Sequence, residues 1–318
     1  MANITQTSVD PAIPEFWLAL ALGYLKANLM MARLVRRDGD SVVAEHGDTI
    51  NITKRGGLTV RDKVEDTDVT ADAPSNTKIA GVLDIGTQCS LVRRKSGRFV
   101  LLDTYTLTPD VERAIKEATD GGEAIDAILN LHPFHTLHAK FMRKAFPNAR
   151  MIGSERHIRK APELGWEGLR VDDPALWQEF SEDFDFTVPE GVDFISADER
   201  VHFSSVLVRH KPSGIIHSDD TLMFLRLPPP ASWFGLGGKI TYHPTLAKAL
   251  EPRPGAAADF RTWAGKIAEE WGDGDTLCAA HSGVWSHSRN GGPPLKQQLH
   301  NALQKVEKVL AAHEKQHG

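Results

Sequence analysis

Three histidines spaced three residues apart are the strongest sign of chemistry in this 318-residue sequence. His132, His135 and His138 directly follow the apolar run 127–131, which is expected to form a short buried strand. Imidazole is a common neutral ligand for zinc and related divalent ions, so the spacing predicts a metal site. A second interpretation stays open, in which one or two of these histidines only cap the helix expected to begin near His138.

Further side chains of the metal-ligand type stand where other short strands are expected to begin or end. The candidates are Asp103, His202, Asp219, Asp220 and His281. Several such residues on converging strand ends are what a metal site requires, because each supplies one bond. Adjacent carboxylates repel unless a cation or hydrogen-bond donors lie beside them, so Asp219 and Asp220 are the most informative pair. Residues expected to serve as ordinary polar or orienting groups are Asp103, His157, His210 and His217.

Short strands and helices alternate in the part of the chain that must position these residues. Between residues 79 and about 190, the sequence predicts strands at 89–94, 98–103, 125–131 and 149–153, with helices at 108–119 and 138–146. The second half predicts strands at 192–195, 202–210, 214–220 and 276–281, a helix at 259–271 and an amphipathic terminal helix over 295–310. Residues 228–258, rich in proline and glycine, look like an insertion or lid.

Composition is that of an ordinary folded protein of 35.0 kDa, with 41% hydrophobic and 25% charged residues and a net charge of −5. Neither the first 78 residues nor the remainder is basic, so a nucleic-acid partner is not expected. Cys89 and Cys278 lie far apart, which argues against a disulfide framework and favours a cytoplasmic location. The apolar run 16–25 has no basic residues before it and is soon followed by Lys26, so neither a signal peptide nor a membrane span is expected.

The first 78 residues differ in pattern from the rest, and two domains are expected, 1–78 and 79–318. The first is expected to contain a helix from Pro14 to about Arg37, short strands at 42–44, 48–53 and 58–60, and an acidic arm or linker at 64–77. This segment resembles the start of tailed-phage major capsid proteins, on the residues 28–38, 47–52, 58–62 and 68–70. The resemblance implies a coat-protein arm and an extended loop, joined to the rest by a gene fusion or recombinant junction near 76–82.

From about residue 79 the chain resembles the metallo-β-lactamase fold family, whose members form a four-layer αββα sandwich. The matching features are 99–103, the histidine cluster after Asn130, the strand from His202, and the segments 218–222 and 280–283. The spacing His-x-x-His-x-x-His departs from the usual His-x-His-x-Asp-His pattern, and Leu137 stands where the second-metal aspartate is expected. The chain more closely resembles a divergent branch of the family, on its His-Pro-Phe-His motif and the segment Phe146 to Arg150.

The resemblance also implies a ligand set and an activity. It makes His132, His135 and His202 ligands of a first metal, His138 and His281 ligands of a second, and Asp220 a bridge. Asp220 or Asp219 is then the candidate base, and the expected activity is metal-dependent hydrolysis of a small-molecule substrate. Zinc is the expected ion, iron and manganese are alternatives, and either one or two ions fit. The rival interpretations are a non-catalytic protein of the same fold and a capsid-derived structural or fusion protein.

One geometric expectation follows from placing all these residues at strand ends. The side chains expected to converge at one edge of a two-sheet sandwich are those of His132, His135, His202, Asp220 and His281. His138 is expected close by, one helical turn further along, while Leu137 is expected to point into the core.

Overall fold

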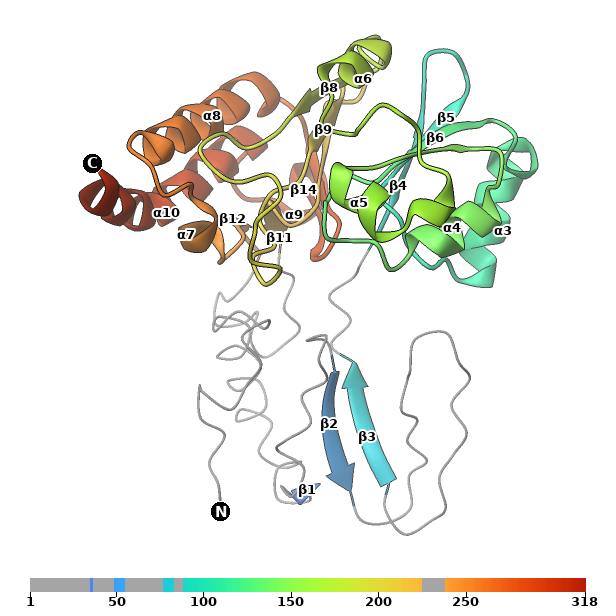
Figure 1. Ribbon diagram of the computed structural model, residues 1–318, viewed down its shortest axis with the longest axis horizontal. Helices are drawn as coiled ribbons and strands as arrows, with labels where there is room; N and C mark the ends of the chain where they lie inside the picture. The colour runs from blue at the N-terminus through green and yellow to red at the C-terminus, as the bar shows by residue number, and fades with distance from the viewer. Residues whose placement is uncertain (1–34, 37–48, 55–76, 83–87, 225–237) are drawn as a thin grey trace. The chain divides into compact units, whose positions relative to one another are not determined.

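The computed structural model describes residues 35–36, 49–54, 77–82, 88–224 and 238–318 (Figure 1). The chain divides into two compact units. One unit comprises Met1–Asp84 with Pro228–Phe234, and the other comprises Ile85–Leu227 with Gly235–Gly318.

The first unit contains a three-stranded antiparallel sheet. Its strands, in the order β1-β2-β3, are Val35–Arg36, Thr49–Lys54 and Thr77–Val82. Strand β2 confirms the strand expected at 48–53, where alternating threonine and isoleucine favour an extended backbone. The helix expected to reach Arg37 is wrong at its end, because Val35 and Arg36 pair with Lys54 and Thr53.

Several expectations for this unit lie outside the described residues. These are the helix at 14–34, the strands at 42–44 and 58–60, the linker at 64–76 and most of the residues that carry the capsid resemblance. Position 78 falls within β3, and the division into domains 1–78 and 79–318 stays a prediction.

The second unit begins with a four-stranded sheet, in the order β4-β5-β6-β7. Its strands are Ser90–Arg93, Phe99–Leu102, Ile125–Leu129 and Arg150–Ile152. Strands β4 and β5 form an antiparallel hairpin, and β5, β6 and β7 are parallel. Helices α3 (Pro109–Ala118) and α4 (Ala139–Ala145) provide the crossovers that parallel strands require. The strands and helices expected in this region are confirmed.

A five-stranded sheet follows, in the order β14-β13-β10-β9-β8. Its strands in chain order are β8 (Phe184–Thr187), β9 (Leu207–His210), β10 (Ile215–Ser218), β13 (Thr276–Ala279) and β14 (Gly283–Ser286). Strands β10 and β13 are parallel, and the other neighbours are antiparallel. Strands β11 (Leu222–Phe224) and β12 (Ile240–Tyr242) form a separate antiparallel pair.

The remaining elements are helical. They are α5 (Glu155–Lys160), α6 (Pro174–Glu179), α7 (Leu246–Ala249), α8 (Ala256–Trp271), α9 (His287–Asn290), α10 (Leu295–His317) and two 3₁₀ turns, Asp120–Gly122 and Pro162–Leu164. Within the described ranges, no helix combines the length and apolar content that crossing a membrane requires.

One predicted strand in this unit is wrong, and the predicted insertion or lid at 228–258 is described only from residue 238 on. The strand expected at 192–195 is a loop in which Val192 makes a single bridge to Leu250. The described part of the expected lid, 238–258, contains β12 and α7, whose residues belong to the core. Apolar residues such as Ile240 and Leu246 are buried there, so this part packs into the core of the unit.

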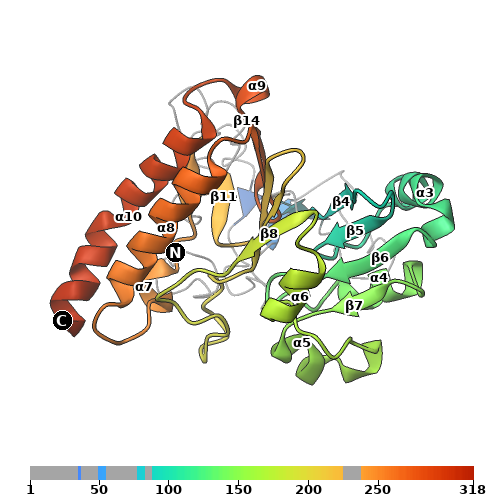
Figure 2. The ribbon, with the colours of Figure 1, turned by 90° about the horizontal axis from the view of Figure 1, so that it is seen from above.

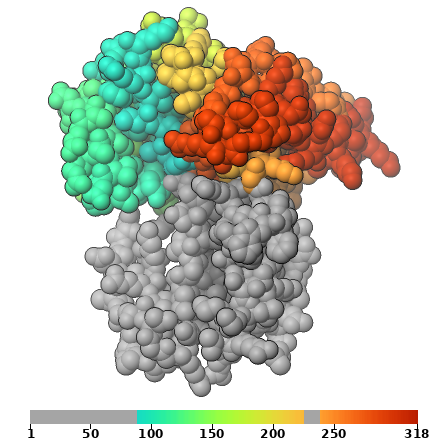
Figure 3. Space-filling view, turned by 180° about the vertical axis from the view of Figure 1, so that it is seen from behind, coloured from blue at the N-terminus to red at the C-terminus, as the bar shows by residue number. Residues whose placement is uncertain are grey.

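Three apolar layers show how the two sheets stack. Val100 and Leu129 of the four-stranded sheet pack with Phe184 and Val208 of the five-stranded sheet, which defines the layer between the sheets. The outer face of the five-stranded sheet is covered by α8 and α10, and the outer face of the other sheet is covered by α3 and α4. Figure 2 shows these layers in sequence, and Figure 3 shows α10 (red) and α3 (green) at opposite sides of the unit. The expected four-layer αββα architecture is confirmed.

Candidate metal centre

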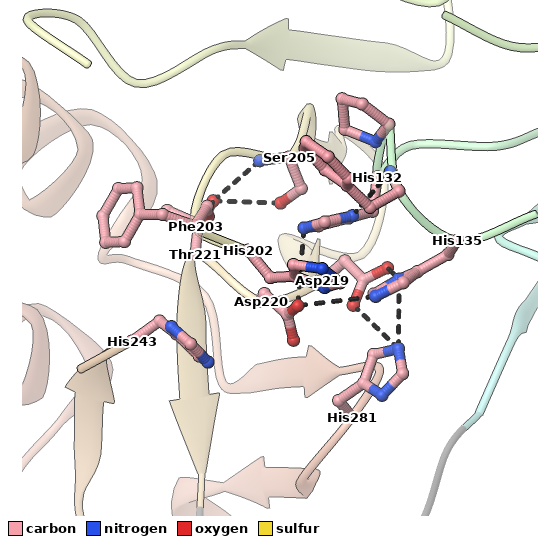
Figure 4. A network of polar contacts seen from close by, with 12 residues as sticks. His132, His135, His202, Phe203, Ser205, Asp219, Asp220, Thr221, His243 and His281 are labelled. Atoms are coloured by element: carbon pink, nitrogen blue, oxygen red, sulfur yellow. Dashed lines mark hydrogen bonds and ion pairs between the residues drawn. The ribbon is translucent and has the colours of Figure 1, made fainter. Parts of the chain in front are cut away.

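The candidate metal centre forms where three strands end (Figure 4). Strand β6 leads through two buried residues to His132, and the next turn carries His135, whose N–H donates to the His132 carbonyl oxygen at 3.2 Å. Strand β10 runs directly into Asp219 and Asp220, and β13 ends just before His281. Each strand is held by its sheet, so these side chains project from a rigid frame.

The side chains approach one another closely. Asp220 Oδ2 lies 3.4 Å from His132 Nε2 and 3.5 Å from His135 Nε2. Asp219 Oδ2 lies 2.7 Å from His135 Nδ1, and Asp219 Oδ1 lies 3.4 Å from His281 Nε2. The His281 Nε2 and His135 Nδ1 atoms are 3.1 Å apart. Two buried carboxylates therefore face three imidazole rings.

This donor set fits a divalent cation. His135, Asp219, Asp220 and His281 each offer one ligand atom, and these atoms all lie within 4.8 Å of one another. Neighbouring ligand atoms around a tetrahedral zinc ion lie about 3.4 Å apart, given bonds of about 2.0–2.1 Å. Among the described residues, the buried Asp219 Oδ1 has no hydrogen-bond partner, although buried polar atoms normally have one. A bound cation would satisfy that oxygen.

His132 fits less directly than the other four residues. The Phe134 N–H donates to His132 Nδ1 at 3.1 Å, which leaves the ring proton on Nε2, the atom that faces Asp220. Within the described part of the chain, Nε2 has no hydrogen-bond partner. Nε2 becomes a ligand atom only if the ring adopts its other tautomer. His132 could therefore be an additional ligand, but it is not one of the four residues that define the site.

The electrostatics show that a positive charge is favoured between the carboxylates. Burial lowers the pKa of His135, but the adjacent Asp219 and Asp220 outweigh burial and raise that pKa well above its ordinary value. Burial raises the pKa of Asp220, but the charges of His281, His135 and His132 lower it well below its ordinary value. Without a metal, a proton on His135 supplies the positive charge, and a bound metal would replace that proton.

The pKa values of His132 and His202 are shifted in the opposite direction to that of His135, which favours their neutral forms. Burial lowers the pKa of His132 well below its ordinary value, and the neighbouring His135 lowers it further. Burial also lowers the pKa of His202. His202 Nε2 donates to the Glu199 carbonyl oxygen at 2.7 Å, which leaves Nδ1 as the atom with a lone pair. Metal-binding histidines commonly donate their second ring N–H in this way.

The structure thus brings together most of the residues expected to converge. His132, His135, Asp220 and His281 meet at one cluster, and the His202 ring centroid lies 5.7 Å from that of His132. Their roles as ligands stay a prediction, as does the role of either aspartate as a base. Asp219 takes a more central position than the sequence indicated, since it contacts both His135 and His281.

His138 and Leu137, in the same segment as His132 and His135, do not lie where the sequence predicts. His138 precedes α4, where its Nδ1 is hydrogen bonded to Thr106 Oγ1 at 2.8 Å, and its ring packs beside Tyr105. His138 is not one of the four residues whose ligand atoms lie together, so its predicted role as a ligand is not supported. The expectation that Leu137 points into the core is wrong, because its side chain is 56% exposed. Leu137 lies in the turn before α4, and the buried positions of that helix are Ala139 and Met142.

The sequence did not indicate His243, which lies near the cluster. It follows β12 and is buried, and burial lowers its pKa, with Asp220 as the main opposing charge. In Figure 4 its ring faces the region around Asp220. The signal that could have identified it is the same one that marked the other sites, a histidine directly after a short apolar strand. The proline and glycine content of 228–258 instead favours an insertion or lid, which hides that signal.

Asp103 has the orienting role expected of it. Its Oδ1 accepts a hydrogen bond from the Leu131 N–H at 2.8 Å, and its Oδ2 accepts one from His217 Nε2 at 2.7 Å. His217 Nδ1 in turn accepts the Ser90 hydroxyl proton at 2.9 Å. Asp103 adopts a φ of 62°, which is uncommon for a residue with a side chain. The chain Ser90–His217–Asp103 joins the two sheets next to the peptide that precedes His132.

Comparison with known proteins gives a structural similarity only. No family model matches the sequence, and no curated protein matches it. The DIM-1 metallo-β-lactamase exposed to ceftazidime is 11% identical, with 83% of this chain and 95% of that chain covered and a TM-score of 0.41. A metallo-β-lactamase from Erythrobacter litoralis is 12% identical, with 85% and 99% covered and a TM-score of 0.43. The mono-zinc form of FIM-1 from Pseudomonas aeruginosa is 11% identical, with 83% and 94% covered and a TM-score of 0.41.

At such low identities and TM-scores, these similarities carry no argument about activity. The fold of this chain is defined by its own strand order and layers, and its chemistry has to be argued from its own side chains.

Proposed function

We propose that this chain is a metal-dependent hydrolase of the metallo-β-lactamase fold that acts on a small-molecule substrate. The observation that supports this most strongly is the buried pair Asp219 and Asp220, which faces three imidazole rings. Among the described residues, one oxygen of this pair, Asp219 Oδ1, has no hydrogen-bond partner. Burying two adjacent carboxylates is costly unless positive charge lies beside them. A divalent cation is the simplest permanent source of that charge.

The proposed ligands are His135, Asp219, Asp220 and His281, with His132 and His202 as further ligands. Zinc is the proposed ion, and iron or manganese would suit the same nitrogen and oxygen donors. A bound ion of this kind lowers the pKa of a coordinated water and polarises the bond to be cleaved.

Asp220 and Asp219 would have further roles beside binding the ion. The pKa of Asp220 is held well below its ordinary value, so Asp220 stays ionised and can accept a hydrogen bond from a water near the cluster. The low pKa makes its carboxylate a weak base, so the bound ion would supply most of the activation of that water. Asp220 is 7% exposed and Asp219 is 2% exposed, which makes Asp220 the more accessible of the two candidate bases. The contact of Asp219 with His135 Nδ1 fixes the direction of that imidazole ring.

A second candidate is a protein of this fold that binds metal without catalysing a reaction. It is favoured by the position of His138, whose Nδ1 is hydrogen bonded to Thr106, and by the exposed Leu137 at the place of the expected aspartate. Of the two residues implied for a second metal, His281 belongs to the four-residue group, whereas His138 lies apart from it. A cytoplasmic location and the capsid origin of the N-terminal segment stay predictions.

Hydrolysis and metal dependence can be tested together. Purified protein is assayed with chromogenic β-lactam, ester and phosphodiester substrates, before and after removal of metal with a chelator and after zinc is returned. We expect at least one substrate class to be cleaved, with loss on chelation and recovery with zinc. The D220N variant should lose turnover while D110N, at an exposed site, should keep it. Bound zinc without cleavage of any class would favour the non-catalytic candidate.

A further inference from the structure

Helix α5 lies against the loop that carries the metal-site histidines. His157 of this helix is completely buried, and its Nδ1 accepts a hydrogen bond from the Ser154 N–H at 3.1 Å. The single proton of the neutral ring is therefore on Nε2. That Nε2–H donates to the backbone carbonyl oxygen of His135 at 3.1 Å.

The neighbouring residue of the same helix holds the rest of the loop. Arg156 Nη1 donates to the Pro133 carbonyl oxygen at 3.3 Å, and its guanidinium carbon lies 4.4 Å from the centre of the Phe134 ring. The Phe134 ring also stacks on the His202 ring, with the ring centroids 4.9 Å apart and an angle of 25° between the ring planes. Two consecutive helix residues thus contact three consecutive loop residues, from Pro133 to His135.

The position of the His157 ring is itself fixed by packing. A Cβ atom at Gly153 would lie 2.8 Å from the His157 Cβ and 2.9 Å from the Trp166 ring, so only glycine allows this approach. The Ser154 hydroxyl lies 2.9 Å from His157 Nδ1, and the Trp166 ring packs at 5.2 Å. A buried side chain held by such packing, with its tautomer fixed by hydrogen bonds, is a rigid donor.

We propose that His157 is a positioning residue of the metal centre. By holding the His135 carbonyl oxygen, it sets the rotation of that peptide and hence the direction in which the His135 ring faces Asp219 and Asp220. This inference rests on the proposed metal-dependent function, because the ring direction matters only if His135 is a ligand. Groups that orient a metal ligand typically change metal affinity about 10–100-fold when they are removed.

Two variants at this position separate the hydrogen bond from the packing. H157L removes the donor, whereas H157Q retains an N–H near the position of Nε2. Both variants lose the Nδ1 acceptor of the Ser154 N–H, so the comparison isolates the bond to His135. The measurements are the zinc Kd, by competition with a chromogenic chelator, and the visible absorption spectrum of the cobalt(II)-loaded protein.

We expect H157L to weaken zinc binding at least about tenfold and to change the cobalt spectrum, while H157Q stays close to wild type. The near-ultraviolet circular dichroism of the metal-free proteins is compared first, because a merely structural role would disturb folding in both variants alike. If H157L does not fold, H157Q decides the question, since zinc binding far weaker than wild type there would contradict the proposal.

The inference and the proposed function fail in different ways. A wild-type protein that binds no zinc overturns both. A wild-type protein that binds zinc, together with an H157L variant of equal Kd and identical cobalt spectrum, overturns the positioning role and leaves the metal centre intact.

Discussion

The substitution D219N tests whether the buried carboxylate pair exists to hold a cation. Asp219 is 2% exposed, and its two oxygens lie 2.7 Å from His135 Nδ1 and 3.4 Å from His281 Nε2. Asparagine keeps the shape and one acceptor oxygen but removes the charge. Loss of a group that only orients a ligand weakens metal binding about 10–100-fold, so loss of the charge of a proposed ligand is expected to weaken binding by at least about tenfold. At saturating zinc this removes at least about 1.4 kcal/mol of metal-dependent stabilisation, because each tenfold change in Kd corresponds to about 1.4 kcal/mol.

The assay is chemical denaturation with and without zinc, for wild type, D219N and the control D110N. The change in the free energy of unfolding on adding zinc is the quantity compared, so effects on the metal-free protein cancel. Asp110 contacts Arg113 at an exposed site, and D110N should gain as much from zinc as wild type does. An equal zinc-dependent gain in D219N and wild type would refute the reasoning, because Asp219 would then not contribute to a cation site.

Three further predictions follow from individual contacts. Zinc affinity should fall as pH decreases between about pH 8 and 5, because the raised pKa of His135 lets a proton compete with the ion; a Kd that is flat over this range contradicts the assignment. D103A should lower the free energy of unfolding by about 1–3 kcal/mol in urea denaturation, because the buried N–H groups of Leu131 and His217 lose their acceptor, and an unchanged midpoint counts against this. L137A should change stability by less than about 0.5 kcal/mol because the side chain is exposed, whereas a larger loss would indicate burial.

Much of the second unit could be predicted because its signals are local. Apolar runs bounded by turn residues predict the four strands β4 to β7 and, in the other sheet, β9, β10 and β13, but not β8 or β14. Polar residues directly after those runs predict most of the cluster. This works because the strand period and the strand end together decide where a side chain projects. The same reasoning applies to Asp103, whose place after β5 put it beside the peptide that leads to His132.

The features that the sequence does not predict depend on contacts that produce no periodic pattern in the sequence. His157 binds a backbone carbonyl 22 positions earlier in the chain, and a side-chain bond to a backbone atom does not depend on the type of residue that carries the carbonyl. Leu137 lies in a turn, where neither helical nor strand periodicity sets the direction of the side chain. His243 lies in a segment whose proline and glycine content favours an insertion or lid, although β12 pairs with β11 there.

X-ray absorption at the zinc edge of the reconstituted protein tests the central claim most directly. The metal centre described here predicts only nitrogen and oxygen ligands at about 2.0–2.1 Å, with scattering from imidazole rings, and loss of that zinc signal in H135A but not in L137A. A sulfur ligand at about 2.3 Å, or a zinc environment that is the same in wild type and H135A, would contradict a site built on His135, Asp219, Asp220 and His281.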